Sequence, residues 1–256
     1  MKIMNFEATK RFSRTVEHYI RYRPGYPDAL LEFVHEQLKL TPQSIIADIG
    51  SGTGLLTGIF LKNGNPTYAV EPNTEMRHAA EHLLKDYPHF TSVDGTAETT
   101  TLPNQSVDFI TAGTAFHWFE LKVARQEFQR ILKPGGYVLL IWNYRNNERS
   151  AFMQDYENYL LEYSSDYKKV KEAYPGDELF DQFFGKGHWQ QVIFENLQVF
   201  DFEGLKGRYQ SCSYALPEDS SQFNTAMDAL RVIFERHQKD GKIEHWYHTV
   251  LYYGKL

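Results

Sequence analysis

Residues 47–57 read ADIGSGTGLLT and place three glycines at alternate positions, directly after an aspartate that ends an apolar run. The residues before them are β-branched, whereas residues 53–64 have the apolar spacing of a helix and end at Gly64. The glycines therefore mark a turn from a strand into a helix. Glycine is favoured at such a turn because the backbone can bend sharply and approach a ligand without a Cβ in the way.

The alternation of strand and helix continues to residue 142. Five such alternations predict a parallel sheet covered on both faces, because crossovers between parallel strands are right-handed and lay helices over the sheet. The expected fold class is α/β: a Rossmann-like doubly wound sheet of seven strands, mostly parallel with an antiparallel last strand, plus a helical cap insertion. Ligands of such sheets bind beyond the carboxyl ends of the strands. The predicted strands are residues 44–50, 66–72, 89–95, 107–113 and 136–142, and the predicted helices are residues 53–64, 73–87 and 121–133.

After Trp142 this rhythm ends in a polar, tyrosine-rich stretch that is helical in parts, which fits an inserted cap better than another strand–helix unit. Residues 189–204 then resemble a strand, residues 218–238 a helix and residues 244–256 a closing strand. Four regions follow: an N-terminal lid and helix (1–40), a cofactor-binding core (41–143), the helical cap insertion (144–190) and a C-terminal completion of the sheet (191–256).

Composition narrows the class of protein. The 256 residues carry a formal net charge of −6 and no run of basic residues, so nucleic acid is a poor partner. The single cysteine, Cys212, excludes an intrachain disulfide and a thiolate metal cluster. The first residues lack the apolar core of a signal peptide, and no apolar stretch approaches membrane-spanning length. We therefore expect a cytoplasmic protein that binds neither nucleic acid nor membrane, as a monomer or homodimer.

Three kinds of binding site for nucleotides or nucleosides use a glycine turn of this kind. A phosphate-binding P-loop needs lysine followed by serine or threonine at the helix start, where this chain has Leu55 and Leu56. The dinucleotide pattern GxGxxG is disfavoured because Leu55 occupies its third glycine position. The remaining interpretation combines Asp48 and the glycines with Glu71 at the end of the second strand, whose carboxylate suits the two hydroxyls of a ribose and repels a 2′-phosphate. A nucleoside cofactor is therefore predicted.

Taken together, these motifs resemble the class I S-adenosylmethionine-dependent methyltransferases of the methyltransferase type 11 family. DIGSGTG matches the first motif of that family, VEPN the acidic second motif, GTAETTTLPNQSVD the segment beside the adenine, and LKPGGYVLLIW the fifth strand. The match is strong over residues 45–142. YIRYRPGYP near the start and FHWF after strand four are similar to the branch that includes trans-aconitate methyltransferases.

The resemblance implies S-adenosyl-L-methionine as cofactor, S-adenosyl-L-homocysteine as product and a small-molecule acceptor, with no metal. One departure concerns the adenine: relatives commonly have GDAE where this chain has Thr96 in place of the aspartate, so adenine selection falls to the Ala97 backbone, Glu98 or Asp94. The candidate cofactor-binding residues are Asp48, Gly50, Ser51, Gly52, Gly54, Glu71, Pro72, Asn73, Met76, Thr96, Ala97, Glu98, Thr114, Tyr22 and Arg23. The candidate acceptor-binding residues are Trp118, Tyr144, Arg145 and Tyr19.

His117 is the candidate catalytic residue because it lies just past strand four, where the acceptor is expected. As a general base it would give a rate that rises with pH near an ordinary histidine pKa of about 6.5. The alternative is a structural histidine among the aromatic rings of FHWF. Arg23 also has two possible roles: it binds the carboxylate of the cofactor's methionine part, or it bridges surface carboxylates of the protein. Two other functions also stay open: a non-catalytic module that binds the nucleoside, and an NAD-linked oxidoreductase.

Overall fold

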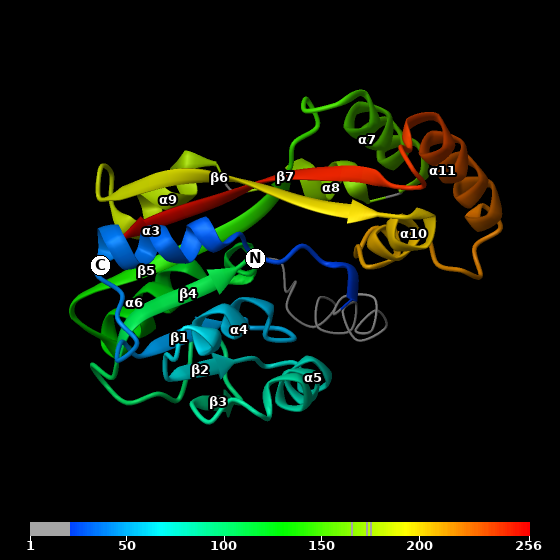
Figure 1. Ribbon diagram of the computed structural model, residues 1–256. Coiled ribbons are helices and arrows are strands. Elements are labelled where there is room, and N and C mark those ends of the chain that lie inside the picture. The colour runs from blue at the N-terminus through cyan, green and yellow to red at the C-terminus, as the bar shows by residue number, and fades with distance from the viewer. Residues whose placement is uncertain (1–20, 165, 173, 175) are drawn as a thin grey trace.

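The computed structural model describes residues 21–256 except 165, 173 and 175, and it is built on a seven-stranded sheet of order β3-β2-β1-β4-β5-β7-β6 (Figure 1). The first five strands in this order are parallel, and β7 runs antiparallel to both β5 and β6. The predicted doubly wound sheet with an antiparallel last strand is therefore confirmed. The strands are β1 (Ile46–Ile49), β2 (Thr67–Val70), β3 (Phe90–Val93), β4 (Val107–Gly113), β5 (Leu132–Arg145), β6 (Trp189–Phe200) and β7 (Ile243–Gly254).

Helices cover both faces of this sheet because neighbouring residues of a strand point to opposite sides. In β5, Leu139 and Ile141 pack with α3 and α4 on one face, whereas Leu140 and Trp142 pack with α6 and α9 on the other. The helices of the core are α3 (Asp28–Leu38), α4 (Leu55–Lys62), α5 (Thr74–Leu84), α6 (Leu121–Ile131) and α9 (Asp177–Phe184), with the short η1 (Phe116–Trp118) after β4. The side chain of Asn73 accepts a hydrogen bond from the backbone of Met76 and caps α5.

The connection from β3 to β4 contains no helix, in agreement with the predicted helices, none of which lies between residues 95 and 107. The hydroxyl of Thr96 accepts hydrogen bonds from the backbone N–H groups of Glu98 and Thr99, both at 3.2 Å. Such local bonds from a threonine compete with helix formation. The segment therefore turns back towards β4 as a loop.

The cap draws its helices from two parts of the chain. Strands β6 and β7 continue beyond the core to reach α7 (Ala151–Tyr163), α8 (Tyr167–Glu172), α10 (Phe202–Gln210) and α11 (Phe223–His237), whose apolar residues form one cluster (Figure 1). Helix α9 packs against the core instead, although it lies in the same insertion as α7 and α8. Helix α10 was not predicted, because its polar sequence FEGLKGRYQ contains two glycines and little apolar periodicity.

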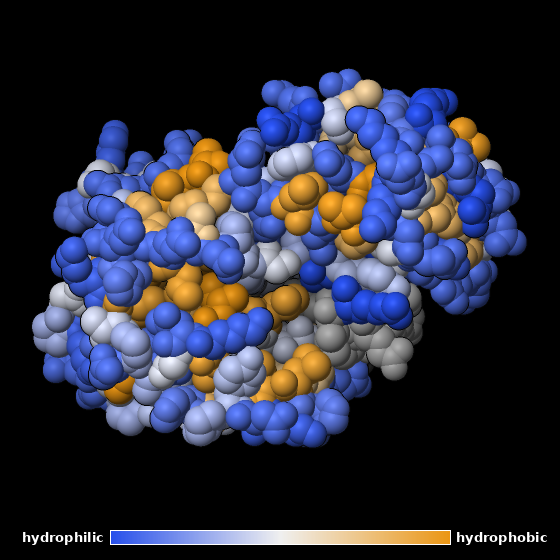
Figure 2. All heavy atoms as spheres, in the orientation of Figure 1, coloured by the Kyte–Doolittle hydropathy of each residue, from blue (hydrophilic) through white to orange (hydrophobic). Residues whose placement is uncertain are grey.

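In the space-filling view the core and the cap form two lobes, with mostly hydrophilic residues on the cap and a band of hydrophobic residues across the core (Figure 2). Much of the aromatic content lies between elements: Phe116, Trp142, Phe180 and Tyr252 pack ring against ring beneath the site. None of the helices in the described ranges is both long and apolar enough to cross a membrane.

Candidate active site

The glycine turn after β1 has three glycines with positive φ, at +67° for Gly50, +57° for Gly52 and +84° for Gly54. A Cβ on Gly50 would lie 2.7 Å from Cβ of Ala115, and one on Gly54 would lie 2.5 Å from Cδ1 of Leu84. Gly50 and Gly54 are therefore required by close packing as well as by φ. Gly52 differs, because no protein atom lies within 4 Å of the position its Cβ would take. The space over Gly52 is open to a ligand.

Asp48 ends β1 with a side chain that is completely buried. Its carboxylate accepts hydrogen bonds from the hydroxyls of Thr57 (2.6 Å) in α4 and Thr111 (3.0 Å) in β4. Burial raises the pKa of Asp48 to about 6, and the two threonine bonds oppose this shift without cancelling it. The structure thus holds a costly buried carboxylate at the carboxyl end of the first strand.

Glu71 follows β2 and lies beside the same turn. One carboxyl oxygen accepts from the backbone N–H of Gly52 (2.9 Å) and the other from that of Asn73 (2.8 Å). Burial raises the pKa of Glu71, while these backbone bonds and the charge of Arg77 lower it in part. Each carboxyl oxygen can accept a second bond, so Glu71 fixes the glycine turn and still offers acceptors to a diol.

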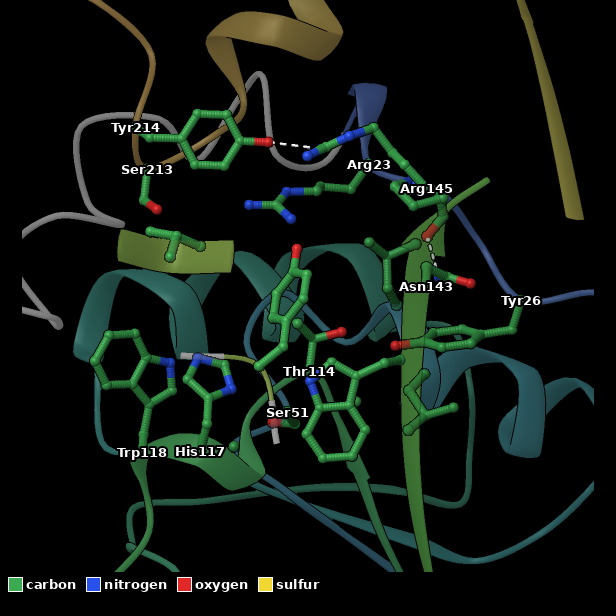
Figure 3. Close-up of a pocket in the computed structure, with 18 of the residues that line it drawn as sticks. Arg23, Tyr26, Ser51, Thr114, His117, Trp118, Asn143, Arg145, Ser213 and Tyr214 are labelled. Atoms are coloured by element: carbon green, nitrogen blue, oxygen red, sulfur yellow. Dashed lines mark hydrogen bonds between the residues drawn. The ribbon is translucent and has the colours of Figure 1, made fainter. Parts of the chain in front are cut away.

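A cavity of about 350 Å³ opens beside the turn, between the core and the cap (Figure 3). Figure 3 shows Ser51, His117 and Trp118 on one side of it, and Arg23, Arg145, Ser213 and Tyr214 on the opposite side. Of the predicted residues, those that line the cavity are Asp48, Gly50, Ser51, Thr114, His117, Trp118, Arg23 and Arg145.

Two residues after β4 are unusual: Thr114 in its backbone conformation and His117 in a buried polar atom without a partner. Thr114 has a positive φ of 56°, which is uncommon for a threonine and typical of functional turns. His117 lies in η1 with its ring 4.7 Å from that of Trp118, and its Nδ1 is buried without a hydrogen-bond partner. Burial lowers the pKa of His117 to about 4, below the ordinary value of about 6.5 that the general-base alternative assumed. The imidazole is neutral at physiological pH.

The N-terminal segment reaches the cavity through Arg23, Pro24 and Tyr26. Arg23 donates a hydrogen bond from Nη2 to the backbone oxygen of Ser211 (3.1 Å) and so joins this segment to the cap. Tyr22 packs its ring against Gly207 of α10 rather than lining the cavity. Tyr19 lies outside the described residues.

The residues predicted to surround the nucleoside lie apart from this cavity, at the ends of β2 and β3. Each carboxylate proposed for adenine has one partner on one oxygen: Asp94 pairs with Arg77 at 3.0 Å, and Glu98 accepts from the backbone of Glu120 at 2.8 Å. Ala97 is buried and Thr96 exposed. Asn73 and Met76 are buried at the start of α5, whereas Pro72 is exposed.

Tyr144 and Arg145, at the end of β5, differ in whether they line the cavity. Tyr144 is stacked along Trp142 and meets Tyr174 edge-on, and it is not among the residues that line the cavity. Arg145 points into the cavity, where the cap contributes Arg208, Ser213 and Tyr214, which sequence reasoning missed. No local pattern marks these three residues, because the turn after α10 meets the site only through the tertiary packing of the cap.

The comparisons with known proteins agree with this arrangement. Residues 47–140 match the methyltransferase domain family. An uncharacterised methyltransferase of Schizosaccharomyces pombe is 28% identical over 252 residues, which is 95% of this chain and 96% of the relative. An uncharacterised methyltransferase of Mycobacterium bovis is 33% identical over 144 residues, 56% of each chain. A malonyl-[acyl-carrier protein] O-methyltransferase of Marinomonas is 28% identical over 136 residues, covering 52% of this chain and 50% of that protein.

Two solved structures share the fold. One is described as a methyltransferase from an antibiotic biosynthesis pathway of Anabaena variabilis, with a TM-score of 0.64, 22% identity and coverage of 92% of this chain and 99% of the other. The second, from Geobacter sulfurreducens, is a methyltransferase in complex with S-adenosyl-L-homocysteine, with a TM-score of 0.54, 14% identity and coverage of 96% and 98%. These structures show the fold, and the domain match over residues 47–140 and the methyltransferase relatives identify the chain as an S-adenosylmethionine-dependent methyltransferase.

Proposed function

We propose that this methyltransferase acts on a small-molecule acceptor and transfers the methyl group by in-line displacement. The observation that carries the proposal is the cavity itself: about 350 Å³ between the carboxyl ends of the core strands and the cap, with the start of the glycine turn on its wall. A cavity of this size suits a small organic molecule, in line with the usual size of small-molecule sites. The acceptor would lie between the core and the cap.

The described residues fit S-adenosylmethionine. The space over Gly52 is open, and the buried Oγ of Ser51 has no hydrogen-bond partner among the described residues. Asp48, Gly50 and Ser51 would surround the amino-acid end of the cofactor, and Glu71 would accept hydrogen bonds from the ribose. The adenine would lie near Ala97, where the backbone and the second carboxyl oxygens of Asp94 and Glu98 offer hydrogen bonds.

When bound, S-adenosylmethionine supplies an already activated methyl group, so the protein's work is alignment and exclusion of water. The rings of Trp118 and Trp142 line the cavity and exclude water from it. His117 is neutral and could take a proton from an acceptor that must lose one. An acceptor that is already ionised would need no base, and His117 would then orient it.

Calorimetry and turnover test the proposal in sequence. We expect S-adenosylmethionine and S-adenosylhomocysteine to bind and NAD to give no heat. Screening small acids, phenols and amines with a methyl-labelled donor should then show transfer to at least one of these classes. NAD binding without a response to the other two ligands would overturn the cofactor assignment. Transfer confined to protein or nucleic acid would overturn the small-molecule acceptor.

A further inference from the structure

The charge of the cavity is opposite to that of the whole chain. The chain has a net charge of −6, but the cap side of the cavity is lined by basic side chains. Among the described residues the basic ones are Arg23, Arg145, Lys169 and Arg208, and the acidic ones are Asp48 and Asp166. The two acidic side chains have partners within the protein, whereas Arg145 and Arg208 have no described carboxylate partner.

The hydrogen bond and the cation–π contacts that Arg145 makes with described residues are with tyrosines. Its Nη1 donates to the hydroxyl of Tyr214 (2.7 Å), and its guanidinium carbon lies 4.9 Å from the centre of the Tyr167 ring. Its Nε is buried and has no hydrogen-bond partner. In the part of the chain that the structure describes, no carboxylate forms an ion pair with Arg145.

Arg208 also has no described carboxylate partner, and it is buried, with 4% of its surface exposed. Its Nε donates to the hydroxyl of Tyr247 (2.8 Å), and its Nη1 to Oγ of Ser211 (3.1 Å) and Sγ of Cys212 (3.0 Å). It too forms no ion pair with any described carboxylate, and Nη2 has no hydrogen bond to a described residue.

The nearby acidic groups are engaged elsewhere. Asp166 pairs with Lys169 at 3.3 Å, and the two form a salt bridge at the rim, where 81% of the lysine side chain is exposed. Glu157, whose charge acts on Arg145, is bonded to Lys171 (2.6 Å) and to the Tyr167 hydroxyl. The carboxylate of Asp48 is held by threonines of the core. No described carboxylate therefore forms an ion pair with Arg145 or Arg208, and the Cys212 thiol is the ionisable group that Arg208 contacts.

Two titratable groups of the cap respond to this positive charge. Burial raises the pKa of the Cys212 thiol, but the charges of Arg208, Arg23 and Arg145 outweigh it and bring the pKa down to about 7. Burial lowers the pKa of His245, and Arg208 and Arg145 lower it further. Burying a cation without a carboxylate partner costs free energy, and one thiol beside Arg208 does not balance two arginines. Two such arginines beside one cavity are best explained by a ligand that brings negative charge.

We propose that the methyl acceptor carries an oxyanion group, a carboxylate or a phosphate, and that Arg145 and Arg208 bind it at the cap side of the cavity. Guanidinium groups suit this role because their fixed N–H geometry matches the oxygens of such anions. This inference rests on the proposed function, since it names the acceptor class of the same site. Arg23 is not part of this anion site; it joins the N-terminal segment to the cap and would bind the methionine carboxylate of the cofactor.

The test separates the acceptor anion from the cofactor's own carboxylate. Citrate and inorganic phosphate are titrated by calorimetry into protein saturated with S-adenosylhomocysteine, so that the cofactor site is already filled. The variants are Arg145→Gln, Arg145→Lys and Arg208→Gln, with Arg236→Gln as the matched control, because Arg236 is a cap arginine that pairs with Asp155 outside the cavity. Thermal unfolding shows whether the buried Arg208→Gln variant folds, and Arg145→Gln carries the test if it does not.

We expect one of the two anions to bind the wild type and Arg236→Gln equally. Arg145→Gln should weaken that binding by about 10- to 100-fold, the loss usual for a hydrogen bond to a charged group, with partial recovery in Arg145→Lys. Affinity for S-adenosylhomocysteine should stay within about threefold of wild type in all variants that fold. Citrate binding would assign a carboxylate, and phosphate binding a phosphate.

Activity gives an independent readout. In the methyl-transfer screen, carboxylic acids or phosphate monoesters should be methylated, and the matched amides or free alcohols should not. Failure of both anions to bind the wild type, equal binding to Arg145→Gln, or turnover of the amides as fast as the acids would each overturn the proposal. Anion binding that depends on Arg145 in a protein that binds no S-adenosylhomocysteine would instead overturn the proposed function and leave the arginine site standing.

Discussion

Asp48→Asn should make this protein more stable and a poorer binder of its cofactor. The carboxylate of Asp48 is fully buried at the end of β1, and its pKa is raised from 3.8 to about 6, mainly by burial. The amide of asparagine has nearly the same shape. The hydroxyls of Thr57 and Thr111 can rotate to accept from it as well as donate, so the local packing is kept.

The magnitude follows from the pKa shift. Because the folded pKa lies above the unfolded one, the folded state binds more protons between about pH 4 and 6, and the free energy of unfolding falls as pH rises through that interval. A shift from 3.8 to about 6 corresponds to about 3 kcal/mol once the group is fully ionised. Asp48→Asn removes this cost, so its advantage over wild type should grow from near zero at about pH 4 to about 2–3 kcal/mol at pH 7.

Urea unfolding of both proteins at several pH values from 4 to 7, with calorimetric titration of S-adenosylhomocysteine at pH 7, measures the two effects. We expect the two stability curves to diverge with pH while cofactor affinity in the variant falls by about 1.5–3 kcal/mol, the usual loss for a charged hydrogen bond. Parallel stability curves would show that Asp48 carries no burial cost. Unchanged affinity would remove Asp48 from the cofactor site.

Three further predictions concern the same site. Glu71→Gln should cost about 1–3 kcal/mol in both stability and cofactor affinity, because the NH₂ group of the glutamine is a donor and would face another donor, the N–H of Gly52 or Asn73. Full cofactor affinity in the folded variant, measured by calorimetry, would contradict this. Gly52→Val should abolish cofactor binding, whereas Gly135→Val, which has a similar positive φ and equally open space, should lose only stability; equal binding losses in both would point to a general backbone effect. His117→Gln should lower turnover by less than about tenfold, below the 10²–10⁴ of general acid–base catalysis, and the wild-type rate should be flat from about pH 6 to 8 because burial holds the His117 pKa near 4. A larger loss with intact cofactor affinity would make His117 the base.

Much of the core follows from local sequence. The turn at Gly50 to Gly54 was predictable because positive φ favours glycine, and the structure shows a positive φ at Gly50, Gly52 and Gly54. The place of Glu71 was predictable as well, since parallel strands end at one edge of the sheet and β2 lies beside β1. Helix α10 was missed because its glycines and polar residues give no helical periodicity, and the packing of Leu205 and Tyr209 into the cap stabilises it instead.

The charge of the site could not be predicted in the same way. Arg145 was an open candidate because it lies at the end of the fifth strand. Its neighbours in sequence do not say that Tyr167 and Tyr214 would contact it, or that no described carboxylate would pair with it. Likewise His117 was assigned an ordinary pKa, and only its burial beside Trp118 lowers that pKa to about 4. The sequence by itself determined the sheet, the glycine turn and the family, because backbone conformation and hydrophobic period act over a few residues. Tertiary structure alone decided the cavity, the lack of a described carboxylate partner for its two arginines and the protonation of its histidine, because burial and pairing depend on residues that meet only in the folded chain.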